Sequence, residues 1–381
     1  MNPNTLLAET QLVICVGSGG VGKTSTSAAI GLRAALEGRR VLVLTIDPAK
    51  RLANSLGLSA FGNEIARISL PEHARGELHA LMLDTQSTFD NLVDQLAPNV
   101  ATRDRILQNP IYRTLSDTFA GSQEYMATEK LHDVVTSGRF DMVVLDTPPV
   151  KNALDFLEAP GRLSRFFDKK VLKWFLTPYD EKKVFGALMM GTSAVIFRLL
   201  SYIFGKEFLE DLSEFFLLWQ DMTEEFRRRH DRVQRMLKEG STRFVTVCAP
   251  TEPSVEVASF FAIELRKRGL PRAGVVVNQV HPGGLAELSP KEVLGPIAAV
   301  RGSDLAGGTD RTLLARLALT HTRYRELVAA ERARIDDIRS LLGDHDGFLI
   351  EVPRLEEEVN DLDGLALLGD HVFGPRHVNN S

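Results

Sequence analysis

Short runs of apolar residues recur along the chain with the length and composition of buried strands. Each run holds five or six residues, rich in valine, leucine and isoleucine. The runs cover residues 12–16, 41–45, 78–83, 141–145, 244–248, 274–278 and 348–352. Longer segments with helical periodicity separate most of them. Strands that alternate with helices predict an α/β fold with a mostly parallel sheet and helices on both faces.

The segments between the runs are predicted to be mainly helical, with one exception. The predicted helices span 25–36, 91–138 with a break near Asn109 and Pro110, 254–268 and 310–342. The exception is 281–309, which contains glycine, proline and small polar residues. We predict a mobile loop there.

The turn after the first predicted strand has the sequence GSGGVGKT, residues 17–24. It matches the phosphate-binding pattern G-x-x-x-x-G-K-[ST], in which backbone N–H groups and the positive end of a helix face the phosphates. We predict that Lys23 reaches the β- and γ-phosphates of ATP or ADP and that the Thr24 hydroxyl binds Mg²⁺. A chance glycine-rich turn is the alternative, and the flanking strand and helix argue against it. The residues assigned to nucleotide binding here are Gly17, Ser18, Gly19, Gly20, Val21, Gly22, Lys23, Thr24 and Ser25.

Two of the aspartates that follow predicted strands are candidate site residues. Asp47 follows 41–45, and Asp146 follows 141–145. Because ligands bind beyond the carboxyl ends of parallel strands, both aspartates should lie on the edge that carries the phosphate loop. An apolar strand that closes on aspartate is the Walker-B arrangement, so Asp146 is expected to bind Mg²⁺ directly or through a water. For Asp47, which precedes proline, capping of a turn is the alternative role.

The helical stretch 154–240 is unusually rich in large apolar side chains. Its large aromatic residues include Phe166, Phe167, Trp174, Phe175, Phe185, Phe197, Tyr202, Phe204, Phe208, Phe215, Phe216 and Trp219. In the most apolar part, 184–205, Arg198 is the only charge. That length suits a transmembrane span, but Arg198, three glycines and three hydroxyl residues argue against one. Two interpretations stay open: an ordinary helical core, or a surface that shelters an apolar segment of another protein.

Composition narrows the class of protein. The chain has 381 residues, 44% of them hydrophobic, and a formal net charge of -5, which argues against a nucleic-acid partner. The only two cysteines, Cys15 and Cys248, lie in apolar strand-like runs, so we expect free buried thiols. No C-x-x-C pair is present, and no structural zinc is expected. The N-terminus lacks the pattern of a signal peptide, which predicts a cytoplasmic protein.

Five motifs, in this order, resemble the family of arsenical-pump ATPases and ATPases that target tail-anchored proteins, a group with a deviant Walker-A loop. The motifs are GSGGVGKTS (17–25), TIDPAKRLANSLG (45–57), LDTPPVKNALDFLEAP (145–160), VVVNQV (275–280) and EVPRLEEEVNDLDGLALLG (351–369). The resemblance implies that they are the phosphate loop, two switches, an adenine-contact strand, and an adenine loop with the C-terminal tail.

The resemblance also implies roles for single residues. Asp47 would orient the attacking water, which makes Asp47 and Lys23 the catalytic residues. Thr24, Asp47 and Asp146 would form the Mg²⁺ site. Asn278 would bind adenine, although a turn at the end of a strand is an alternative role for it. Pro353 and its neighbours would close over the base.

The implied domain organisation is discontinuous. Residues 1–90, 126–155 and 241–381 would form a P-loop ATPase core, and 91–125 and 156–240 a helical, aromatic-rich subdomain. The expected assembly is a homo- or heterodimer with a related ATPase, with a hydrophobic client protein or a membrane partner. Such a partner would give the cytoplasmic protein a peripheral association with the membrane.

The chain departs from the family pattern in three places. Ser18 stands where the family usually carries a lysine that reaches the partner's nucleotide across a dimer, and serine cannot supply that charge. Lys50, Arg51 and Lys151 are candidates to replace it. The metalloid-binding cysteines of arsenical pumps have no counterpart, and neither does the C-x-x-C of the zinc-linked dimers.

The function predicted first is Mg²⁺-dependent binding and hydrolysis of ATP, with nucleotide switches that reposition the helical subdomain to bind an apolar segment of a membrane protein. One alternative is an ATPase subunit that energises or regulates a membrane transporter for a substrate other than arsenite. Another is a nucleotide-dependent switch or scaffold with low turnover, which the serine at position 18 makes plausible.

Overall fold

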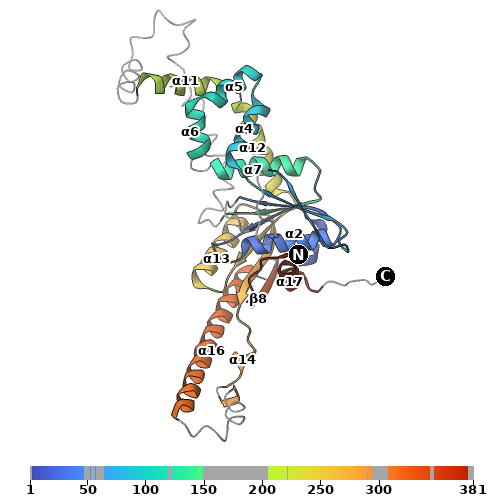
Figure 1. Cartoon of the computed structure of the whole chain (residues 1–381), viewed down its shortest axis with the longest axis vertical. Helices are drawn as coiled ribbons and strands as arrows, with labels where there is room; N and C mark the ends of the chain where they lie inside the picture. Colours follow the sequence, from blue (N-terminus) through green and yellow to red (C-terminus); the bar gives the residue numbers. More distant parts are fainter. Residues whose placement is uncertain are drawn as a thin grey trace, which may run out of the picture.

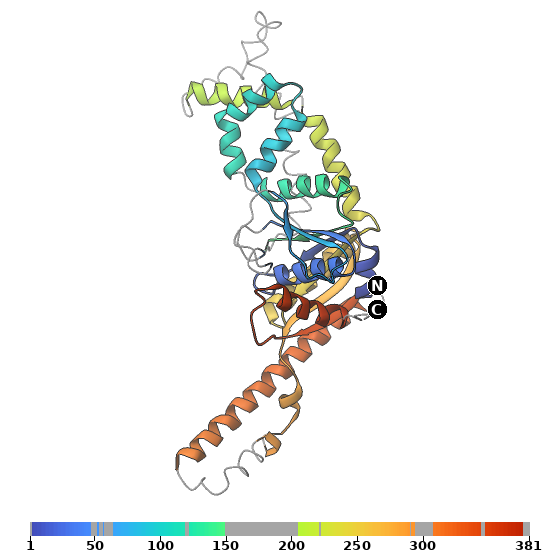
Figure 2. The same cartoon turned by 45° about the vertical axis from the view of Figure 1, so that its right-hand side comes forward.

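The computed structural model describes residues 2–46, 52, 56, 64–118, 122–148, 205–220, 222–289, 291–293, 308–343 and 347–375. An eight-stranded sheet lies at the middle of the molecule, with helices on both of its faces (Figure 1). A layer of further helices stands on one side of the sheet. On the opposite side the long helix α16 (Gly308–Leu342) projects away from the body, with the short helix α14 (Gly284–Glu287) beside it (Figure 2).

The strands of this sheet are β1 (Leu12–Val16), β2 (Arg40–Thr45), β3 (Ala66–Ile68), β4 (Glu77–Met82), β5 (Met142–Asp146), β6 (Thr242–Cys248), β7 (Arg272–Val280) and β8 (Phe348–Pro353). Their order is β3-β4-β2-β5-β1-β6-β7-β8, and every neighbouring pair is parallel except β3 with β4. All seven predicted strands are confirmed. The sequence prediction missed β3, because three residues at a sheet edge are too few to show a period.

The helices are α1 (Pro3–Glu9), α2 (Lys23–Leu36), α4 (Thr85–Leu96), α5 (Val100–Gln108), α6 (Pro110–Thr118), α7 (Ser122–Thr136), α11 (Lys206–Gln220), α12 (Thr223–Lys238), α13 (Glu252–Lys267), α14 (Gly284–Glu287), α16 (Gly308–Leu342) and α17 (Leu362–Phe373). The predicted break near Pro110 is confirmed between α5 and α6. Asn109 stabilises it, since its side-chain oxygen accepts a hydrogen bond of 2.9 Å from the N–H of Ile111.

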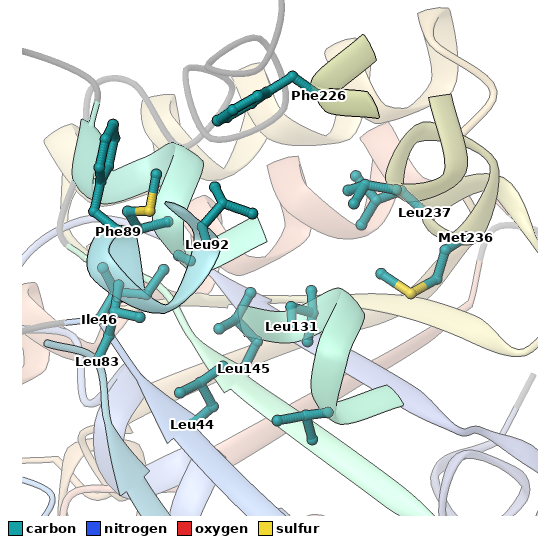
Figure 3. Close-up of a cluster of buried hydrophobic side chains, with 14 of the residues drawn as sticks. Leu44, Ile46, Leu83, Phe89, Leu92, Leu131, Leu145, Phe226, Met236 and Leu237 are labelled. Atoms are coloured by element: carbon teal, nitrogen blue, oxygen red, sulfur yellow. The ribbon is translucent and has the colours of Figure 1, made fainter. Parts of the chain in front are cut away.

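Alternate residues of each strand face opposite sides of the sheet and pack into three buried clusters, the third of which joins β6 and β7 to α13 and α16. Leu12 and Ile14 of β1 pack in one core with α4, α7, α11 and α12. Figure 3 shows part of this core, with Leu44 of β2 and Leu145 of β5 near Leu131 of α7. Val13 and Cys15 pack in a second core with α1, α2 and α17. The strands are therefore covered on both faces, which explains why they appear in the sequence as continuous apolar runs.

Aromatic side chains hold the helical layer together around Trp219. The Trp219 ring lies 5.7 Å from Phe89 of α4 and 5.2 Å from both Phe215 and Phe226, measured between ring centres. Trp219, Phe215 and Phe216 are almost fully buried, whereas Phe208 is 42% exposed. For these three aromatic residues the core interpretation is correct. The aromatic residues between 166 and 204 lie outside the described residues.

The predicted loop at 281–309 holds a short helix and long-range hydrogen bonds at its described beginning, and its mobility stays a prediction. This part contains α14 and is bonded to α16, where His321 Nε2 contacts the carbonyl oxygen of Leu285 at 2.7 Å. The Tyr324 hydroxyl donates to the carbonyl of Pro282 at 2.7 Å, and α16 already begins at Gly308. Composition predicted the turns but not these hydrogen bonds, which come from a helix far along the chain.

Both cysteines are free and buried, as predicted. Burial raises the pKa of the Cys15 and Cys248 thiols to about 12. Each thiol therefore stays protonated near neutral pH. Among the described helices, none combines the length and the low polarity needed to cross a bilayer. The apolar segment 184–204 lies outside the described residues.

Candidate functional site

The phosphate-loop sequence follows β1, the strand between β5 and β6, at the carboxyl edge of the sheet. At two positions of this loop, neighbouring atoms lie so close that only glycine fits. Gly17 has φ 154°, and a Cβ there would overlap the carbonyl oxygen of Val247 on β6. Gly22 begins α2 in the left-handed region at φ 89°, and its Cβ would overlap the amide nitrogen of Asn278. Larger residues at these positions would displace the loop.

Lys23 lies inside this loop. Its side chain is buried, with 6% of the residue exposed, and Nζ donates a 2.7 Å hydrogen bond to the carbonyl oxygen of Ser18. The positive charge is therefore held across the loop, next to the N-terminus of α2. Positive charge, backbone N–H groups and a helix N-terminus in one place form an anion-binding site.

Asp146 at the end of β5 lies against the loop. Its Oδ2 accepts hydrogen bonds from the Thr24 hydroxyl at 2.8 Å and from the Thr45 hydroxyl at 3.1 Å. Only 1% of Asp146 is exposed. Hydroxyl and carboxylate oxygens are the ligands that Mg²⁺ prefers, so this donor set fits Mg²⁺.

The end of β7 contacts the other side of the loop. The Asn278 side-chain amide donates to the carbonyl of Val21 at 2.9 Å, and the Gln279 amide donates to the carbonyl of Gly20 at 3.3 Å. Asn278, predicted to bind adenine, therefore holds the loop backbone here. Its contact with adenine stays a prediction.

A cavity of about 670 Å³ opens above these residues. That volume suits a small-molecule ligand. Its lining residues are Gly20, Gly22, Lys23, Thr24, Ser25, Thr147, Asn278, Gln279, Arg354, Leu355, Glu356, Glu357, Glu358, Val359, Asn360 and Leu368. Pro353, predicted to close over the base, ends β8 beside Val280 and is not among them, whereas the residues directly after it are.

The wall at 354–360 is fixed at both ends. β8 precedes it in the sheet, and α17 follows it and packs against α2. Arg33 of α2 bonds the Asp370 carboxylate of α17 at 2.8 Å. Asp361 caps α17 by accepting a 2.8 Å hydrogen bond from the N–H of Gly364. The phosphate loop leads into α2 and the wall leads into α17, so the packing of these two helices fixes the wall relative to the loop.

Ser18 has a partner within the chain. Its hydroxyl lies 3.0 Å from the Ser254 hydroxyl on α13, and Ser254 Oγ accepts a 2.9 Å hydrogen bond from the N–H of Ala249. The side chain at the position of the family's lysine is therefore turned toward α13 of its own subunit.

The structure brings Lys23, Thr24, Asp146 and Asn278 together, as the sequence predicted. Asp47 lies outside the described residues, as do Lys50, Arg51 and Lys151. Sequence reasoning missed three contributors. Thr45 ends β2, so its place at the same sheet edge was a usable signal. The sequence held no signal for Gln279 or Ser254. A bulge in β7 brings Gln279 to the loop, and the distant helix α13 brings Ser254 to it.

The family model described as anion-transporting ATPase matches residues 10–290, which is most of the chain. The chain belongs to the anion-transporting ATPase family. Members are ATPases, and the chain is accordingly an ATP-binding hydrolase, in agreement with the loop and its lysine.

The similarity of this chain to curated relatives extends over different lengths. An ATPase ASNA1 homolog of Plasmodium chabaudi chabaudi is 24% identical over 99% of this chain and 91% of its own length. ATPase GET3B of Arabidopsis thaliana is 26% identical over 70% of this chain and 63% of its own length. The arsenical pump-driving ATPase of Escherichia coli is 28% identical, but over 40% of this chain and 26% of its own length. The similarity to the ASNA1 homolog thus extends over nearly the whole chain.

Proposed function

We propose that the chain is a Mg²⁺-dependent ATPase whose nucleotide state repositions its helical subdomain to bind an apolar segment of a membrane protein. The observation that carries the magnesium part is the 2.8 Å contact between Thr24 of the loop and Asp146 of β5. It joins the phosphate-binding turn to the strand-end carboxylate that a Walker-B site requires.

The residues around the cavity have separate roles in this proposal. The N–H groups of 17–24 orient the phosphates, and Lys23 neutralises charge on the β- and γ-oxygens. Thr24 and Asp146 hold Mg²⁺, which when bound withdraws charge from the transferring phosphoryl group. Asp47 orients the attacking water. The wall at 354–360 encloses the base.

A matched pair of aspartates tests the ATPase part, because the two flank the same strand. Asp146 ends β5 in the site, and Asp141 precedes β5 at its other end, where it forms an ion pair with Arg40 at 2.7 Å. Asp146→Asn is expected to lower Mg²⁺-dependent phosphate release by about 10²- to 10³-fold. Asp141→Asn should leave the rate unchanged. Equal rates for the two variants would contradict the proposal.

The client part rests on the resemblance and on the apolar composition of 184–205. Because Trp219, Phe215 and Phe216 are buried in the core, they are not the surface that contacts a client. Binding of a labelled 20-residue leucine–alanine peptide should depend on whether ADP or a non-hydrolysable ATP analogue is present. Equal affinity in both nucleotide states would contradict the client proposal and leave the ATPase part standing.

A second candidate, a switch with low turnover, is favoured by the contact of Ser18 with Ser254. A serine held within its own subunit supplies no charge to a neighbouring nucleotide, whether the assembly is a homodimer or a heterodimer. A turnover number far below about 1 s⁻¹, together with tight ATP binding, would support the switch. Faster turnover would favour the client-binding ATPase.

A further inference from the structure

Near its end, β7 contains a residue other than glycine whose backbone is in the left-handed region. Among the residues that the structure describes, Gln279 is the one non-glycine residue with a positive φ, at 63°. The β7–β8 ladder is irregular at the same point: Val277 pairs with Glu351 and Val280 with Pro353, so two residues on β7 oppose one on β8. Asn278 and Gln279 therefore form a bulge.

The bulge changes where the two side chains point. In a regular strand, neighbouring side chains lie on opposite faces of the sheet. The left-handed turn at Gln279 breaks that alternation, so that both amides reach the phosphate loop, at the carbonyls of Val21 and Gly20. A left-handed glutamine is less stable than a left-handed glycine, and such strain in native proteins is concentrated at functional sites.

The three loop glycines with positive φ differ in their restraint. Gly17 and Gly22 are confined by Val247 and Asn278, as described above. Gly20, at φ 77°, has no atom within 4 Å of where its Cβ would be. The Cβ position of Gly20 thus faces open space, and the Gln279 amide bonds the Gly20 carbonyl oxygen.

We propose that Gln279 is a positioning residue for the nucleotide. By holding the Gly20 carbonyl, its amide keeps the exposed turn of the loop in a shape in which the backbone N–H groups face the phosphates before ATP arrives. Preorganisation of this kind raises affinity because less order has to be created on binding. The inference rests on the proposed nucleotide site.

Two substitutions at one position separate this role from a structural one. Gln279→Gly and Gln279→Ala both remove the amide, but only glycine relieves the left-handed backbone. Both variants should bind ATP about 3- to 10-fold more weakly in titration calorimetry, as expected for one lost hydrogen bond. In the nucleotide-free protein, the glycine variant should unfold at a higher temperature than the alanine variant.

The ATP affinities and the unfolding temperatures together distinguish a positioning role of Gln279 from a structural one. Affinity that is unchanged in both variants, or that falls only in the variant with the lower unfolding temperature, would overturn the inference. Lys23→Ala serves as the control for the site itself and should abolish measurable ATP binding. If Lys23→Ala weakens binding and the Gln279 variants do not, the nucleotide site stands and the role of Gln279 falls. If wild-type protein binds no ATP, both fall.

Discussion

Different forces hold the phosphate loop and the aromatic helical layer in place. The loop is fixed by polar contacts from β5, β7 and α13, such as Thr24 with Asp146, and by the close approach of β6 to Gly17. The helical layer is fixed by ring packing around Trp219. A change in the loop should therefore affect ligand binding first, and a change in the layer should affect stability first.

The largest expected effect is in the helical layer. Trp219→Ala should lower the free energy of unfolding by about 3–5 kcal/mol, because it leaves a cavity among the packed rings of Phe89, Phe215 and Phe226. The folded fraction should still bind ATP with wild-type affinity. Chemical denaturation and calorimetry measure the two quantities. Phe208→Ala, at an exposed position of the same helix, is the control and should cost less than about 1 kcal/mol. Equal losses would contradict the core assignment.

The second effect is in the loop. Gly22→Ala should weaken ATP binding by about 10-fold or more, because its Cβ would displace the Asn278 amide and the backbone would leave the left-handed region. Gly138→Ala is a matched control. Its φ is 65°, and no atom lies near its Cβ position, so it shares the backbone strain without touching the site. An equal loss of affinity in both variants would show that strain alone explains the effect.

The smallest effect concerns the two thiols, each buried in the sheet. With a pKa of about 12, each is about one ten-thousandth thiolate at pH 8 and should not react with an aromatic disulfide reagent in the native protein. Two thiols should react after unfolding in guanidinium chloride. Rapid reaction of the native protein would mean that Cys15 or Cys248 is reached by solvent, which would reopen the question of metalloid binding.

The two regions also differ in how far the sequence predicted them. The fixed positions of the loop are constrained by backbone geometry, so Gly17, Gly22, Lys23 and Thr24 could be assigned from spacing alone. The strand-end position of Asp146 followed from the sheet topology. Contacts from distant elements, as from Ser254 to Ser18, leave no local pattern.

In the helical layer, composition predicted apolar helices but not which faces are covered. Helical periodicity gives the same pattern for a buried stripe and for an open groove. Burial of Trp219 and exposure of Phe208 on the same helix depend on packing against α4 and α12, which no window of the sequence contains. The bonded segment at 281–289 was missed for the same reason, whereas β3 was missed because three residues show no period.

The central claim is that the cavity between the phosphate loop and the wall at 354–360 holds Mg²⁺·ATP. Hydrogen–deuterium exchange with and without a non-hydrolysable ATP analogue and Mg²⁺ tests it most directly. The account predicts slower exchange in peptides that cover 17–26, 275–281 and 353–361, with little change in α5 and α6. Unchanged exchange in those three segments at saturating nucleotide would contradict it.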